Sequence, residues 1–311
     1  MAFFYALPGA VAEGLIWGLM AIGVYISYKI LDIADLTVDG SICTGGCVCA
    51  VLLSLGVPAW VSVLAALIAG ALTGMVTGLL HTRLGIPSIL AGILTQLMLY
   101  SVNLLILSGK SLMPIDPRAN TLLVHMSNNP MSILSLAIIV VATIVILYEF
   151  FYTQVGLTLK SAGDNPDMSR AQGVDVDRNK VIGLAIANGI VAMAGALLAQ
   201  YKGSANINDG RGAIVIALAA IFIGLSVSLK IKPNFVVSLI GVVGGGIVYY
   251  IVYNFVILLG LKTDYLKMLS AIIVALFLGV PYLKAKYFTK QKDLRPSDLA
   301  KKAAAGGDTD A

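Results

Sequence analysis

Long apolar stretches separated by short polar connections make up most of this chain of 311 residues. Each stretch holds about 20 residues, enough for an α-helix to cross a hydrocarbon core roughly 30 Å thick. Windows of about 19 residues predict nine membrane-spanning helices, near residues 8–30, 41–56, 58–81, 87–107, 131–152, 181–201, 213–229, 234–259 and 265–284. The pattern therefore predicts an all-α polytopic membrane protein, a bundle of about nine (eight to ten) transmembrane helices.

Composition strengthens this prediction. The chain is 59% hydrophobic and 12% charged, whereas soluble domains are about 45–50% apolar and roughly 25% charged. Small residues recur inside the predicted spans, as in "GALTGMVTG" at 70–78 and "ANGIVAMAGALLA" at 187–199. Helices in lipid associate through such residues because they let two backbones approach closely. A compact bundle follows, but the pattern suits a channel, a transporter or a membrane enzyme equally.

The basic residues indicate orientation. Seven of the 21 Lys and Arg residues fall between Lys284 and Lys302, which is typical of a cytoplasmic tail beside anionic lipid and argues against a nucleic-acid partner. We therefore divide the chain into a transmembrane domain, 1–284, and a basic cytoplasmic tail, 285–311. With the loop 156–180 also cytoplasmic, fifteen basic residues lie inside and six outside, as the positive-inside rule requires. Nine spans then place the N-terminus outside.

The loop 156–180 carries eight charged side chains between two apolar stretches. Asn165 and Pro166 are typical of a helix start, Asp167 favours the positive end of the helix dipole, and Gly173 is a natural stop. These signals predict a two-turn helix over 166–172, with Met168 and Ala171 on one face. Such a helix suits docking into a groove of another protein, although a capped surface loop without a partner has the same signals.

The segment "GLTLKSAGDNPDMSRAQGVDVDRNKVIGLAIANGIVAMAGALLAQ" resembles the cytoplasmic loop and following helix of permeases from bacterial ABC importers, in the branch serving ribose-type sugars and branched-chain amino acids. Two further segments, "ADLTVDGSICTGG" at 34–46 and "GRGAIVIALAAIFIG" at 210–224, are similar to other motifs of that branch and follow in its order. The residues in register in the first segment are Gly156, Lys160, Ser161, Gly163, Asn165, Pro166, Gly173 and Val174.

The resemblance implies a permease subunit of an ABC importer in the bacterial inner membrane, built from two similar five-helix halves, with one more span hidden near 30–56. The helix at 166–172 would be the coupling helix that docks on a separate ATPase subunit. The implied coupling-loop residues are Gly156, Lys160, Gly163, Asn165, Pro166, Met168, Ala171 and Gly173.

The same resemblance implies the partners. The chain has no GxxxxGK[ST] phosphate loop, so the ATPase subunit would bind the ATP, and we expect neither a cofactor nor an enzymatic activity in this chain. A second permease chain, identical or paralogous, would complete the path. An external solute-binding protein would dock around 108–130 and 202–212.

The segment with Thr37 and Asp39 is most similar to permeases linked to amino-acid uptake, which makes an amino acid the expected solute. The alternatives are a sugar or nucleoside importer and an ion-coupled secondary transporter.

Four residues before the second span, Asp35, Thr37, Asp39 and Gly40, are candidates for a solute path or a broken helix. Acidic residues inside a membrane are costly and often functional, and irregular backbone at membrane depth can line a cavity. Alternatively, the two acids cap a helix in a solvated cytoplasmic position.

Four polar residues inside the predicted spans could line a polar path or join helices by hydrogen bonds: Gln96, Asn103, Asn188 and Asn254. Clustered Cys43, Cys47 and Cys49 favour packing over metal binding, because the histidines lie far away in the chain.

Overall fold

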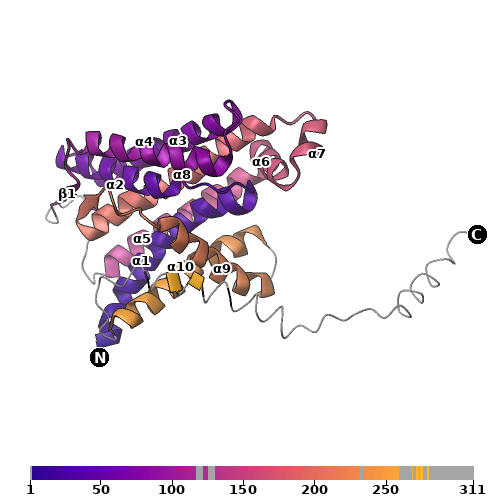
Figure 1. Cartoon of the computed structure of the whole chain (residues 1–311). Helices are drawn as coiled ribbons and strands as arrows, with labels where there is room; N and C mark the ends of the chain where they lie inside the picture. Colours follow the sequence, from indigo (N-terminus) through magenta and orange to yellow (C-terminus); the bar gives the residue numbers. More distant parts are fainter. Residues whose placement is uncertain are drawn as a thin grey trace, which may run out of the picture.

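The computed structural model describes residues 2–116, 122–124, 130–231 and 234–258, with a few single positions between 268 and 279. Within them the chain forms ten α-helices, one π-helical turn and two short strands (Figure 1). In order these are α1 (Ala2–Tyr25), η1 (Ile26–Ile30), α2 (Val38–Ser54), α3 (Ala59–Thr82), α4 (Ser88–Ile106), β1 (Leu112–Pro114), α5 (Pro130–Tyr152), α6 (Gln154–Asp164), α7 (Pro166–Ala171), α8 (Val176–Lys202), β2 (Ser204–Asn206), α9 (Ala213–Ile231) and α10 (Phe235–Leu258).

The predicted all-α membrane architecture is confirmed. In the described part of the chain, six helical segments are long and apolar enough to cross a membrane: 7–30, 59–82, 88–106, 131–152, 176–202 and 235–257. Two shorter apolar helices, α2 and the first part of α9, account for the predicted spans near 41–56 and 213–229. The predicted ninth span, 265–284, lies mostly outside the described residues, and the predicted tail, 285–311, lies wholly outside them.

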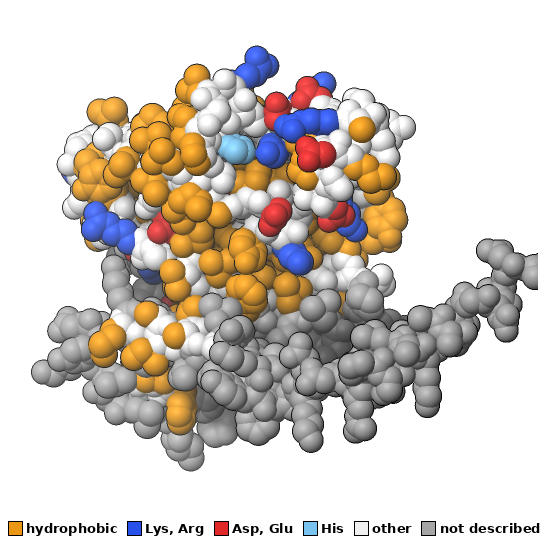
Figure 2. Space-filling view, turned by 45° about the vertical axis from the view of Figure 1, so that its right-hand side comes forward, with side chains coloured by type: hydrophobic (Ala, Val, Ile, Leu, Met, Phe, Trp, Pro, Cys, Tyr) orange, Lys and Arg blue, Asp and Glu red, His pale blue; other side chains and the backbone are white. Residues whose placement is uncertain are grey.

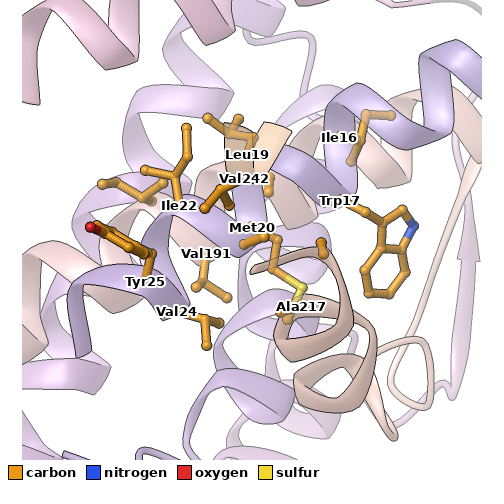
Figure 3. Close-up of a cluster of buried hydrophobic side chains, with 14 of the residues drawn as sticks. Ile16, Trp17, Leu19, Met20, Ile22, Val24, Tyr25, Val191, Ala217 and Val242 are labelled. Carbon is orange, nitrogen blue, oxygen red and sulfur yellow. The ribbon is translucent and has the colours of Figure 1, made fainter. Parts of the chain in front are cut away.

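Helix α1 lies at the centre of the fold and is buried around most of its circumference. Its side chains Leu19, Met20 and Ile22 have no exposed surface. Figure 3 shows them packed with Val191 of α8 and Val242 of α10. A helix that is apolar all round and buried by other helices is typical of the core of a membrane bundle, so α1 is the element around which the other helices are arranged.

Helix α8 passes between α2, α3 and α1, and the packing is close because small residues face one another. At Gly45 of α2, a Cβ would collide with the backbone carbonyl of Ala192 on α8. At Gly195 of α8, a Cβ would collide in the same way with the carbonyl of Ile42 on α2. The two backbones therefore touch directly, as predicted from the small residues of 187–199. Figure 1 shows α2, α3, α4 and α8 side by side.

The outer surface is largely apolar, in keeping with contact with lipid. Large hydrophobic side chains on α5 and α3 are exposed, including Ile146 at 68%, Trp60 at 60% and Ile68 at 60%. Figure 2 shows such side chains spread over much of one face, with many charged side chains gathered toward the top of the view. An apolar surface of this extent on a bundle of long apolar helices is that of a multi-pass membrane protein.

One expectation for the N-terminal part was wrong. The segment 30–56 holds one helix, α2, and no additional span. Between η1 and α2 the backbone at 31–37 is irregular, and it contains Asp32 and Asp35, which interrupt the apolar sequence. The first long helix therefore ends in a π-helical turn, and the chain turns back to begin α2.

Candidate functional site

The predicted coupling loop forms two short helices, α6 and α7, joined by Asn165. Asn165 ends α6 and begins α7, with extended backbone (φ −152°, ψ 94°). Its side-chain oxygen accepts a hydrogen bond from the backbone N–H of Met168 at 3.0 Å. Pro166 occupies the first turn, where its missing N–H costs no hydrogen bond, and Asp167 lies at the positive end of the helix. The helix start is thus as the sequence predicted.

The end of α7 is also fixed by local hydrogen bonds. Gly173 has φ +83°, a left-handed conformation that glycine adopts without a steric cost. Its N–H donates to the carbonyl of Arg170 at 3.0 Å, and the N–H of Val174 donates to the carbonyl of Ser169 at 3.0 Å. This pair of bonds is the Schellman motif. The predicted helix over 166–172 is observed as Pro166–Ala171, so its two ends are defined by the residues that predicted them.

One face of α7 is free to contact another protein. Met168 is 59% exposed and Ala171 is exposed, whereas Ser169 on the other side is buried. Arg170 pairs with Asp177 of α8 at 3.5 Å and with Asp167 at 3.8 Å. Lys160 of α6 is exposed as well. Figure 1 shows α7 projecting at one end of the bundle, far from β1. An exposed apolar side chain on a small, rigidly capped helix is suited to docking.

The loop is anchored to the transmembrane helices through two of the predicted glycines. Gly163 lies against the backbone carbonyl of Ile30, the last residue of η1, and a Cβ at this position would collide with it. Gly156 lies in the same way against Phe150 and Phe151 at the end of α5. Because backbone touches backbone at both points, α6 cannot move without moving the ends of α1 and α5.

The second predicted region, the start of α2, lies inside the protein. Asp35 is only 3% exposed. Its carboxylate accepts from the backbone N–H of Thr37 at 2.9 Å and from the amide of Asn188 at 2.6 Å. Because Asn188 lies near the middle of α8, Asp35 lies at the depth of the helix centre. The alternative of a solvated capping position is therefore wrong for Asp35, although its bond to Thr37 does have the form of a cap.

Asp35 belongs to a buried network of polar side chains that joins four helical segments. Asn188 accepts from Ser41 of α2 at 2.6 Å, and Ser41 bonds Thr73 of α3 at 2.7 Å. Thr37 bonds Thr77 of α3 at 2.7 Å, and Thr77 donates to Thr95 of α4 at 3.0 Å. Each member therefore has a partner, as buried polar groups require. Asn188 thus acts between helices, one of the two roles open for it, whereas the amide nitrogen of Asn254 donates within its own helix to Tyr250 at 3.2 Å.

Asp39 and Gly40 lie in the first turn of α2, on the side facing α4 and α9. The two carboxylate oxygens of Asp39 accept from the backbone N–H groups of Gly212 and Ile214, each at 2.9 Å. Asp39 therefore caps α9 rather than its own helix. Gly40 packs against Leu99 of α4. The contact with α9 could not be predicted from local patterns, because 173 residues separate Asp39 from Gly212.

The loops predicted to face the solute-binding protein are brought together at the other end of the bundle. Strands β1 and β2 pair antiparallel, with Leu112 opposite Asn206 and Pro114 opposite Ser204. Lys202 and Asp209 form an ion pair at 3.0 Å beside this ribbon. The loops after α4 and after α8 thus form one continuous surface, at the end of α8 opposite to α7.

The fold defines a multi-pass helical membrane protein, and comparison with known proteins gives its family. Residues 9–278 match the family described as branched-chain amino acid transport system, permease component. The chain is 36% identical over 291 residues to a tyrosine transport system permease protein of Clostridioides difficile, which covers 93% of this chain and 96% of that protein. This chain belongs to the permease family of ABC importers, as its motifs indicated.

Two more distant relatives extend the comparison. An uncharacterized protein of Rickettsia prowazekii is 30% identical over 272 residues, covering 87% of this chain and 95% of that protein. The ribose import permease protein RbsC of Escherichia coli K12 is 24% identical over 263 residues, covering 83% and 79%. No solved structure matches the chain significantly. Membership of this family implies an ATPase and a solute-binding protein as general partners, and a transport role rather than an enzymatic one.

Proposed function

We propose that this chain is the permease subunit of an ABC importer that carries an amino acid across the bacterial inner membrane. Two observations support the solute class: the relative named as a tyrosine permease is 36% identical, and the relative named as a ribose permease is 24% identical. In this proposal two permease chains form the path, a separate subunit binds ATP, and this chain carries no cofactor. Helix α7 and the tail 285–311 are cytoplasmic, and the β1–β2 ribbon faces the solute-binding protein.

The observation that carries the coupling role is the construction of α7. It is capped at both ends, exposes Met168, and follows α6, whose Gly163 touches Ile30 at the end of η1. Closure of an ATPase dimer would move α7, and rigid contacts would pass that movement to α1 and α5. Transport by this route needs no covalent chemistry, only a change in the packing of rigid helices.

The test is co-purification with the ATPase subunit. The chain is co-expressed with a candidate ATPase, and the wild type is compared with a Pro166→Gly, Met168→Asp double variant. Leu112→Asp, at an exposed apolar position on β1 at the other end of the bundle (47% exposed, against 59% for Met168), is the control. We expect the wild type and the control to retain the ATPase and the double variant to lose it. Equal retention by all three would show that α7 is not the docking element.

Solute class is tested separately, by ATP-dependent uptake into proteoliposomes that contain the complete importer. Uptake of an L-amino acid that ribose does not inhibit supports the proposal. Uptake of ribose alone would make the chain a sugar permease. Uptake that follows an ion gradient and ignores ATP would indicate a secondary transporter.

A further inference from the structure

A polar pocket of about 410 Å³ lies between the start of α2, the middle of α4 and the segment that leads into α9. Its volume falls within the roughly 300–1,000 Å³ of small-molecule sites. It is separate from the buried network of Asp35, because none of the side chains bonded in that network lines it. The lining residues that matter to its chemistry are Asp39, Gln96, Leu97, Tyr100, Asn103 and Arg211.

The pocket contains one acid and one base that are not paired with each other. Asp39 and Arg211, both within the described residues, line the same space, but no salt bridge joins them. Opposite charges that share a pocket without pairing leave room for a ligand that carries both charges. A sugar or nucleoside needs neither of them.

Asp39 is held in place and still has acceptor capacity. Its two oxygens accept one backbone N–H each, from Gly212 and Ile214 at 2.9 Å. A carboxylate offers about four acceptor positions, and the backbone N–H of Ala213 also lies against this one, so about one position is left for an ammonium group. Arg211 presents a guanidinium fork that matches a carboxylate in a bidentate arrangement. The backbone N–H groups at the start of α9 hold the Asp39 carboxylate in place. Arg211, which is exposed, directly precedes Gly212 in the same segment.

A third observation is independent of these charges. Asn103 is 1% exposed and lines the same pocket, and its amide oxygen has no hydrogen-bond partner among the residues that the structure describes. A buried polar atom without a partner costs about 1–3 kcal/mol, so a group of this kind is usually paired when its site is filled. The unmet group is an acceptor, which is what an ammonium or another N–H donor requires.

We propose that this pocket binds the zwitterionic backbone of a free α-amino acid. The ammonium group lies between the carboxylate of Asp39 and the amide oxygen of Asn103, and Arg211 binds the α-carboxylate. Leu97 and Tyr100, which are 65% and 42% exposed, provide apolar contact for the side chain. The net charge of the pocket and that of the ligand are both zero, so binding brings no uncompensated charge among the helices. This inference rests on the proposed function, since it gives the solute a site.

The test uses Leu97→Cys as a reporter in the complete importer. The three native cysteines are buried, but Cys43 lines the same pocket. The wild type, alkylated by a maleimide with and without each probe, therefore gives the background to be subtracted. Leu105→Cys, 79% exposed on the same helix and outside the pocket, is the matched control. The probes are L-amino acids with aromatic, aliphatic, polar and charged side chains. For each one that protects, its decarboxylated amine and its N-acetyl derivative are tested as well.

We expect at least one L-amino acid to slow the alkylation of Cys at position 97 and not at 105. The amine and the N-acetyl derivative should protect only at concentrations about tenfold higher or more, as loss of a charge-assisted hydrogen bond would give. Arg211→Gln should raise the half-protecting concentration by a similar factor, and Arg211→Lys should raise it less.

In the alkylation assay, two results would overturn the inference: no probe protects, or the derivatives protect as well as the parent amino acid. Uptake by the same complex separates this failure from that of the proposed function. ATP-dependent amino-acid uptake that Arg211→Gln leaves unchanged would reject the pocket and keep the function. Protection without any ATP-dependent uptake would keep the pocket as a binding site and reject the function.

Discussion

Asn188 is the side chain whose removal tests the buried network most directly. Its amide nitrogen donates to Asp35, and its amide oxygen accepts from Ser41, each at 2.6 Å. A hydrogen bond to a charged group contributes about 1.5–3 kcal/mol and one between neutral groups about 0.5–1.5 kcal/mol. We therefore expect Asn188→Ala to lower the free energy of unfolding by about 2–4 kcal/mol. Interhelical hydrogen bonds in membrane proteins average only about 0.6 kcal/mol, so the larger value depends on the charge of Asp35.

A double-mutant cycle separates the contribution of that charge. Asp35→Asn keeps an oxygen that can accept from Asn188 but removes the charge, so Asn188→Ala should cost only about 1–2 kcal/mol in this background. Unfolding is followed by tryptophan fluorescence during titration of mixed micelles with SDS. Asn254→Ala is the matched control, because among the described residues its amide nitrogen donates only to Tyr250 of the same helix, at 3.2 Å. We expect it to cost less than about 1 kcal/mol.

Two outcomes would refute this reasoning. If Asn188→Ala costs the same with Asp35 and with Asn at that position, the carboxylate is not charged or is not held by Asn188. If Asn188→Ala costs no more than Asn254→Ala, the network contributes no more than an ordinary intrahelical bond. Either outcome would show that the bonds from neighbouring groups do not stabilise a charged Asp35 at the depth of the helix centre.

Three further predictions follow from the packing. Gly45→Ala should lower the free energy of unfolding in the same titration by about 1–3 kcal/mol, because the methyl group overpacks the contact with α8. Its control is Gly244→Ala, at a helical glycine with open space around it, which should be neutral or stabilising by up to about 1 kcal/mol. Asn165→Ala removes the cap of α7, which is worth about 1 kcal/mol, and should weaken ATPase binding about fivefold in a titration of the purified subunits. Gly163→Val forces α6 away from Ile30, so the ATPase should still bind while the ratio of solute imported to ATP hydrolysed falls.

The transmembrane helices and α7 were predictable because local rules determine them. Length and apolar composition decide which segments can span a membrane. Helix α7 follows from Asn165, Pro166 and Gly173, whose side chains or backbone conformations act on their immediate neighbours. For that reason the predicted end at 172 and the observed end at Ala171 differ by one residue. Such features need no knowledge of which helices lie beside one another.

The setting of Asp35 and Asp39 could not be predicted in this way. Both acids form their decisive bonds with residues that are remote in the chain, Asn188 for Asp35 and Gly212 with Ile214 for Asp39. Sequence alone could identify them as unusual charges beside a short helix, and it did. Whether they were solvated or buried depended on where α8 and α9 pass, which is a property of the whole bundle.

The irregular segment 31–37 connects the two functional regions, and its position explains how one could act on the other. At one end, Ile30 receives Gly163 from the coupling loop, and Leu31 lies against Gly183 of α8. At the other end, Asp35 is bonded to Asn188, and α2 then places Asp39 at the start of α9. The π-helical turn η1 precedes this segment, and such turns are frequent at functional sites because their geometry departs from that of the regular α-helix. A displacement of α6 must therefore be taken up at η1 and 31–37. This segment leads directly to Asp39, which caps α9 and lines the polar pocket.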